Sequence, residues 1–343
     1  MSWPDRRILE LLQIELPILQ APMAGAQLSE MAIAVSQAGG LGALPCGTLS
    51  PDAARAELRK IREATDRPFQ VNFFCHLDPP ADPAREAAWR ARLAPYYAEL
   101  GLHPDSQPAA ARRVPFDSAM CEVVEEFKPA AASFHFGLPG PDLLERARAT
   151  GAKILSSATT VEEARWLADR GCDAIIAQGS EAGGHRAMFL TEDLSTQIGT
   201  MALVPQIVDA VKVPVIAAGG IADGRGIAAA FALGAAAVQI GTAYLFCPEA
   251  KISDAHRAAL RAAMPTAITN VFSGRPARGI ANRLVREMGP MSDLAPQFPL
   301  AASAIAPLRA QSEFAQMWSG EAASLGRELP AGELTRWLAG NIS

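Results

Sequence analysis

The sequence is poor in cysteine and has no excess of positive charge. Its five cysteines lie far apart without a C-x-x-C pair, so we expect neither a zinc knuckle nor a disulfide framework, and predict reduced thiols in a cytoplasmic protein. Lys and Arg number 31 against 36 Asp and Glu, which argues against nucleic acid as a partner. Only five histidines are present, scattered and without carboxylates at ligand spacing, so no metal site is expected.

Signals for export or membrane insertion are also missing. Residues 1–15 carry several charges and no long apolar core, unlike a secretory signal. Residues 226–248 are uncharged and long enough to cross a bilayer, but Gly234 and Gly241 divide them. This pattern favours a buried helix followed by a buried strand over a membrane span.

Short apolar runs alternate with helical patterns along most of the chain. This alternation is typical of βα units around a parallel sheet. The runs predict strands at 18–20, 41–44, 69–73, 131–134, 153–156, 174–177, 215–217 and 236–240. Helices are predicted at 29–38, 51–64, 141–150, 160–170, 200–210 and 226–233, and the fourth of these opens with a capping box formed by Thr160 and Glu163. Eight strands predict an α/β fold of the (β/α)8 TIM-barrel class.

Two additions to this barrel are expected. The barrel would comprise residues 1–74 and 115–248, interrupted by a Pro-rich insertion at 75–114 with a helix around 84–93. Residues 249–343 would form a helical C-terminal cap, with helices at 254–264, 281–289, 312–325 and 332–338. An insertion of this length is too long for a plain loop and is interpreted as a lid. We expect both additions to close over the mouth of the barrel.

The active site of such a barrel lies at the carboxyl ends of its strands. The residues found there are Ala21, Pro22 and Met23 after the first strand, Asn72 in the third, Gln178 after the sixth, Gly219 and Gly220 after the seventh, and Gln239, Ile240, Gly241 and Thr242 at the eighth. Glycines at two adjacent strand ends favour a phosphate-binding site, because only glycine lets the main chain come so close to phosphate oxygens. The alternative is that these glycines only form turns.

Residues 178–186 form the most unusual segment, with three glycines followed by His185. A histidine at the tip of a glycine-rich loop is suited to accept a proton near pH 7, although a hydrogen-bonded loop residue is the alternative. His135 follows the fourth strand and should face the same mouth. The other histidines, His76, His103 and His256, are predicted to be solvated. Neither a G-x-S-x-G nor a G-x-G-x-x-G motif is present.

Taken together, these segments resemble the nitronate monooxygenases, formerly called 2-nitropropane dioxygenases. The resemblance covers the barrel from end to end at residues 17–24, 39–42, 71–76, 134–137, 178–186, 218–221 and 239–242. The run Glu181-Ala-Gly-Gly-His185 is its most specific part.

The resemblance implies FMN bound without a covalent link, and oxidation of alkyl nitronates, and of nitroalkanes, by O2 to a carbonyl compound and nitrite. His185 would be the catalytic base, and His135 would line the substrate site. The FMN contacts would come from the strand-end residues named above together with Gly183. A homodimer is compatible with this reading.

Two positions depart from the family pattern. Phe298 stands where similar members have tyrosine, and Ala306 where they have lysine, which leaves room for a larger or more apolar substrate. The main alternative function is an NAD(P)H-dependent FMN reductase acting on a quinone or an enoyl thioester. A flavin-free, phosphate-binding isomerase or lyase on the same barrel is a second alternative.

Overall fold

A closed ring of eight parallel strands forms the centre of the molecule. The computed structural model describes residues 3–103 and 113–342. The strands are β1 (Ile18–Gln20), β2 (Gly42–Pro45), β3 (Phe69–Phe74), β4 (Ala131–His135), β5 (Lys153–Ala158), β6 (Ala174–Gln178), β8 (Val215–Ala218) and β9 (Ala237–Ile240). They pair in parallel in the order β1-β9-β8-β6-β5-β4-β3-β2, and a parallel bridge between Leu19 and Leu41 closes the ring. The fold is therefore a (β/α)8 TIM barrel, as predicted.

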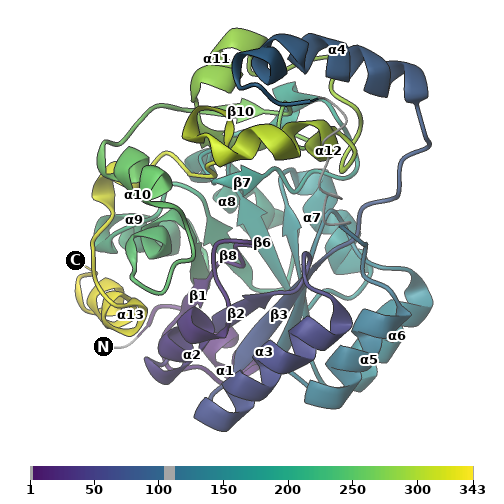
Figure 1. Cartoon of the computed structure of the whole chain (residues 1–343). Coiled ribbons are helices and arrows are strands. Elements are labelled where there is room, and N and C mark those ends of the chain that lie inside the picture. The colour runs from purple at the N-terminus through teal and green to yellow at the C-terminus, as the bar shows by residue number, and fades with distance from the viewer. Residues whose placement is uncertain (1–2, 104–112, 343) are drawn as a thin grey trace.

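Helices surround the barrel between successive strands (Figure 1). They are α2 (Ser29–Gln37), α3 (Pro51–Ala64), α5 (Ser118–Phe127), α6 (Pro141–Ala149), α7 (Val161–Asp169), α8 (Thr200–Ala210) and α9 (Gly224–Ala232). The sequence analysis missed α5, although Asp117 caps its first turn by accepting from the Met120 amide. The uncharged residues 226–248 contain most of α9 and all of β9, as expected. Within the described residues, no helix combines the length and apolar character needed to cross a bilayer.

The predicted capping box at α7 is only half formed. Thr160 accepts from the Glu163 amide as expected. The Glu163 carboxylate, however, accepts from the backbone amide and hydroxyl of Thr159 and from the Phe189 amide. Glu163 therefore anchors the chain that follows His185, because its buried carboxylate needs several donors.

The amino-terminal end of the barrel is sealed by α1 (Arg7–Leu12). Ile8, Leu9 and Leu12 are buried in an apolar cluster with strand residues that point into the barrel, among them Leu19 and Ile216. This leaves the carboxyl ends of the strands as the open end of the barrel.

The insertion and part of the C-terminal segment lie together over that open end. In Figure 1, α4 (Pro83–Glu99), α11 (Arg283–Met288) and α12 (Ala301–Ile305) form a layer at the top, beside β10 (Thr266–Thr269). The Trp89 indole donates to the Ala301 carbonyl at 3.3 Å, and Arg283 pairs with Glu99, so the two additions bind each other.

The C-terminal segment is less helical than the sequence suggested. An antiparallel sheet joins β10 to β11 (Ala277–Ile280) and β11 to β7 (Gly184–His185). Residues 312–325, predicted as a helix, contain only the 3₁₀ turns η4 (Ser312–Phe314) and η5 (Ala323–Leu325). Further 3₁₀ turns are η1 (Leu194–Thr196), η2 (Thr242–Phe246) and η3 (Ala306–Ala310). Helix α10 (Asp254–Arg261) follows the barrel, whereas α13 (Ala331–Gly340) packs on α2 and α9 at the side.

Candidate functional site

A cavity of about 350 Å³ opens at the carboxyl ends of the strands. Of the residues predicted for the site, it is lined by Ala21, Pro22, Met23, Asn72, His135, Gln178, Gly183, His185, Gly219, Gly220, Gln239, Gly241 and Thr242. Ile240 is the exception. Its side chain is buried in the layer between strands and helices, and its carbonyl accepts from the Ala21 amide, which continues the pairing of β1 with β9. Neighbouring residues of a strand face opposite ways, so Gln239 and Ile240 cannot both line one cavity.

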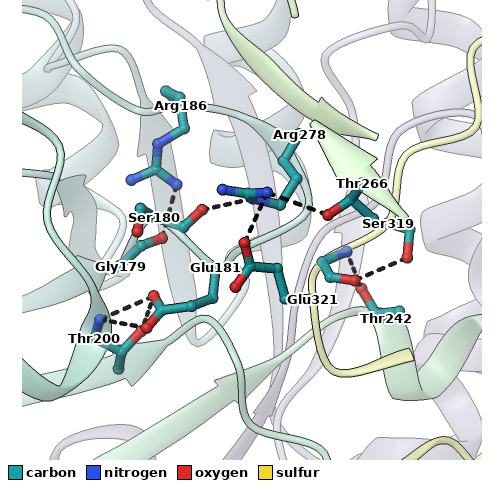
Figure 2. Close-up of polar contacts among 11 residues, drawn as sticks. Gly179, Ser180, Glu181, Arg186, Thr200, Thr242, Thr266, Arg278, Ser319 and Glu321 are labelled. Atoms are coloured by element: carbon teal, nitrogen blue, oxygen red, sulfur yellow. Dashed lines mark hydrogen bonds and ion pairs between the residues drawn. The ribbon is translucent and has the colours of Figure 1, made fainter. Parts of the chain in front are cut away.

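Two arginines hold the loop between Gln178 and His185 by its backbone (Figure 2). Arg186, fully buried, donates to the carbonyls of Gln178 and Gly179, each at 2.8 Å. Arg278, on β11, donates to the Ser180 carbonyl at 2.7 Å and forms an ion pair with Glu321. Guanidinium groups suit this task, because their fixed fork of donors satisfies several carbonyls at once.

His185 lies on β7 and is oriented from the C-terminal segment. Its Nε2 lies 3.0 Å from the Ser273 hydroxyl, and that hydroxyl donates to the Arg275 carbonyl at 3.1 Å. A hydroxyl has one proton, so Ser273 must accept from Nε2–H. The hydrogen-bond network thereby assigns the proton to Nε2 and leaves Nδ1 as the atom able to accept a proton.

His135 supports the backbone of His185. Its Nε2 lies 3.1 Å from the His185 carbonyl, which also accepts from the Gln178 amide at 3.0 Å. A carbonyl oxygen only accepts, so His135 carries its proton on Nε2. Burial lowers the pKa of His135 to about 3, which keeps the ring neutral near pH 7.

The electrostatic surroundings of His185 correct one expectation. The sequence analysis assumed an ordinary pKa, but burial, followed by the positive charge of Arg113, lowers the pKa of His185 well below 6.5. His135, Arg275 and His76 act in the same direction. His185 is therefore neutral and able to accept a proton at neutral pH, and any charge it gains must be stabilised by a neighbouring anion.

The ends of β8 and β9 carry the features of a cofactor site. Gly219 and Gly220 have φ values of 115° and 72°, a backbone shape that side chains disfavour. A Cβ atom on Gly219 would lie 2.9 Å from the Thr200 hydroxyl and 3.0 Å from the Ala182 amide. Beside these glycines, the Gln239 Oε1 atom is buried and has no hydrogen-bond partner in the described part of the chain. A buried acceptor of this kind indicates that a ligand donates to it.

The sequence analysis missed the residues that the C-terminal segment and the loop add to the cavity. They are Glu181, Ala182, Gly184, Lys251, Ile252, Ser253, His256, Gln316, Trp318, Gly320 and Ala322. Glu181 accepts from the amide and hydroxyl of Thr200 at the start of α8, and the Gly320 amide donates to the Thr242 hydroxyl at 2.8 Å (Figure 2). These contacts join segments far apart in sequence, so no local pattern indicated them.

Two histidines assigned to the surface are in fact buried. His76 is 4% exposed and packs edge-on against Phe298, with ring centroids 4.8 Å apart. His256 is 7% exposed, lines the cavity and reaches the Trp318 carbonyl. Both were misassigned because the additions that cover them were treated as solvated segments.

Comparison with known proteins agrees with this geometry. Residues 5–340 match the family model described as nitronate monooxygenase. A nitronate monooxygenase of Pseudomonas aeruginosa is 44% identical over 97% of both chains, and one of Paraburkholderia phytofirmans is 43% identical over 97% of this chain and 94% of the relative.

Two solved structures resemble the fold over nearly its whole length. The nitroalkane oxidase of Streptomyces ansochromogenes superposes with a TM-score of 0.87 and 38% identity, covering 98% of this chain and 97% of that one. FabK from Thermotoga maritima gives a TM-score of 0.75 and 29% identity, covering 99% and 96%. With a family model spanning the barrel and both additions, and relatives this similar over their full length, the chain belongs to the nitronate monooxygenase family and is an oxidoreductase.

Proposed function

We propose that this protein oxidises alkyl nitronates, and more slowly nitroalkanes, with O2 to a carbonyl compound and nitrite, using noncovalently bound FMN. The observation that carries the proposal is the position of His185, a neutral and oriented imidazole in a cavity that is also lined by the strand-end glycines Gly219, Gly220 and Gly241. The family membership supports the reaction class. The substrates are therefore a small nitronate and O2.

The residues present fit a flavin mononucleotide. We expect the terminal phosphate at the backbone of Gly219, Gly220, Gly241 and Thr242, and the unpaired Gln239 Oε1, with Asn72 and Gln178, at the polar edge of the ring. When bound, FMN supplies the electron acceptor and the reaction with O2. Gly183 allows close approach of the C-terminal segment, because a Cβ there would lie 2.5 Å from the Gly320 amide.

In the reaction, the protein itself accepts one proton from the substrate. With a neutral nitroalkane, His185 Nδ1 accepts the proton from the carbon that bears the nitro group, while Nε2–H stays bonded to Ser273. A preformed nitronate has already lost this proton and requires only binding and orientation. The cover of α4, α11 and α12 over the mouth limits access of water.

The test has two parts. Heat-released pigment should have the mass of FMN; FAD, or failure to bind either flavin on reconstitution, would refute the cofactor assignment. Anaerobic mixing with ethyl nitronate or propionate 3-nitronate should bleach the flavin absorbance, whereas NADH and NADPH should not. Bleaching by a reduced nicotinamide nucleotide alone would establish the reductase alternative instead.

A further inference from the structure

Two half-buried arginines have buried guanidinium atoms without a hydrogen-bond partner among the described residues. Arg113, at the end of the insertion, lines the cavity, and its Nη1 atom is buried without a hydrogen-bond partner. Arg309, in η3, has buried and unpaired Nε and Nη2 atoms. No carboxylate in the described residues forms an ion pair with either one. Buried guanidinium donors without acceptors are costly, and a bound anion would satisfy them.

We propose that Arg113, backed by Arg309, binds the oxygen atoms of the nitro or nitronate group and stabilises the negative charge on them. This assignment rests on the function proposed above and names the residue that recognises the substrate's anionic end. It also answers a question raised by the sequence, since Phe298 and Ala306 supply no polar group where similar proteins carry tyrosine and lysine.

The geometry places Arg113 and His185 at one aromatic wall. The Arg113 guanidinium carbon lies 5.4 Å from the centre of the Phe298 ring, and the His185 ring centroid lies 5.2 Å from the same centre. Phe298 packs with Phe74 and Phe136 in a buried cluster, so this wall is apolar and strengthens nearby electrostatic interactions. Phe74 of this cluster lines the cavity together with Arg113 and His185, so a small nitro compound bound there can contact the base and the guanidinium together.

Charge balance connects the two residues. Burial and the neighbouring Arg309 lower the pKa of Arg113 to about 10, so its guanidinium remains charged at pH 7. When the C–H bond breaks, the proton moves to His185 Nδ1 and its electron pair passes to the nitro oxygens. The negative charge then lies beside Arg113 and offsets its positive charge, which, after burial, is the next largest cause of the low pKa of His185.

The experiment uses the FMN-loaded protein with Arg113→Met, Arg113→Lys and, as a matched control, Arg170→Met. Arg170 also stacks on an aromatic ring, 3.9 Å from the centre of Trp166, but lies outside the cavity lining. Nitrate, a planar anion with three oxygens, serves as the binding probe through its effect on the flavin spectrum. For Arg113→Met we expect the nitrate Kd to rise about 10- to 100-fold and kcat/KM for ethyl nitronate to fall about 100-fold.

Arg113→Lys should recover part of both losses, and Arg170→Met should change neither. The pH dependence of nitroalkane turnover is a further measurement, which a purely structural defect would not shift. The charged or titratable groups acting on His185 are Arg113, His135, Arg275 and His76. Removing Arg113 should therefore raise the apparent pKa of the acidic limb, in the pH–rate profile for nitroalkane oxidation, toward the ordinary histidine value of 6.5.

Two outcomes distinguish a failure of this inference from a failure of the proposed function on which it rests. If Arg113→Met binds nitrate and oxidises ethyl nitronate within threefold of wild type, the inference is wrong while the proposed function stands. If the wild-type protein does not oxidise nitronates, the proposed function fails, and the role of Arg113 in that reaction fails with it.

Discussion

The two ends of the barrel differ in what their side chains leave unsatisfied. At the amino-terminal end, α1 and the inward-facing strand residues form a cluster that is entirely apolar. At the carboxyl end, Gln239, Gln316 and Arg113 each bury a polar side-chain atom that has no partner among the described residues. The amino-terminal end therefore mainly contributes stability, although Gln70 there also buries an oxygen without a partner among the described residues. The unpartnered groups named at the carboxyl end line the cavity, where a ligand can satisfy them. The comparison predicts that substitutions at the carboxyl end will mainly lower activity, whereas substitutions at the amino-terminal end will mainly lower stability.

The largest effect is expected at the carboxyl end, for His185→Asn. Asparagine keeps a polar group but cannot act as the base, so turnover of nitroethane should fall about 10²- to 10⁴-fold, equivalent to roughly 3–5 kcal/mol. Turnover of ethyl nitronate should fall much less, and FMN content should be retained. Steady-state oxygen consumption with both substrates measures the ratio. Equal losses on the two substrates, with FMN retained, would show that His185 is not chiefly a base.

Leu12→Ala tests the opposite end. Leu12 is 1% exposed in the apolar cluster, so the cavity left behind should lower the free energy of unfolding by about 2–5 kcal/mol. Urea unfolding followed by circular dichroism measures this change, and kcat per bound FMN should stay at the wild-type value. Leu190→Ala, at an exposed position, is the control and should cost less than about 0.5 kcal/mol. A fall in kcat for Leu12→Ala would contradict the separation of the two ends.

Acidification should lower the stability of the whole fold through four buried histidines. Burial lowers the pKa values of these histidines. The pKa of His135 falls to about 3 and that of His256 to about 4, and the pKa values of His76 and His185 fall below their usual 6.5. The unfolded chain takes up these protons below pH 6.5 while the folded chain does not, so stability falls as the pH drops from 6.5. Each histidine contributes up to about 1.4 kcal/mol per pH unit until its folded pKa is reached.

Urea unfolding at pH 7.5, 6.5 and 5.5 measures this dependence. His135→Gln keeps an amide donor near the His185 carbonyl but does not titrate, so its stability should depend less steeply on pH. A wild-type stability that is flat between pH 6.5 and 5.5 would argue against neutral, buried histidines.

The smallest effect is expected for Ser273→Ala, which removes the acceptor for His185 Nε2–H. Losing one hydrogen bond of about 1 kcal/mol should lower kcat for nitroethane roughly tenfold or less and leave ethyl nitronate within threefold. Nitrogen-15 NMR of the imidazole should show a mixture of tautomers in the variant. Ser36→Ala is the control, since Ser36 is equally buried but bonds to the Pro68 carbonyl on the outer layer. An unchanged tautomer would remove Ser273 from this role.

The strands and most barrel helices could be predicted because their signals are local. Barrel strands are buried on both faces, so they appear as continuous apolar runs that end within a residue or two of the observed bounds, as at 69–73 and Phe69–Phe74. The sheet formed by β7, β10 and β11 has no such signal. Its strands are two to four residues long, and β7 pairs with β11 across a long stretch of sequence.

The site could be predicted in part for the same reason. Residues that follow strands must meet at one end of a barrel, so Asn72, Gln178 and Gln239 were found from position alone. Trp318 and Gly320 were not, because they reach the cavity through the packing of the C-terminal segment. The pKa of His185 also depends on Arg113 and Arg275, and no local sequence pattern indicates that these arginines lie close to His185.

The pairing of β7 with β11 determines when His185 can be oriented during synthesis. His185 lies on β7, whose paired strand among the described residues is β11. Both β11 and Ser273, the hydroxyl partner of His185, are translated later; Ser273 lies 88 residues further along the chain. All eight barrel strands leave the ribosome before either partner does. A nascent chain can thus contain all eight barrel strands before the two partners that orient His185 have been synthesised.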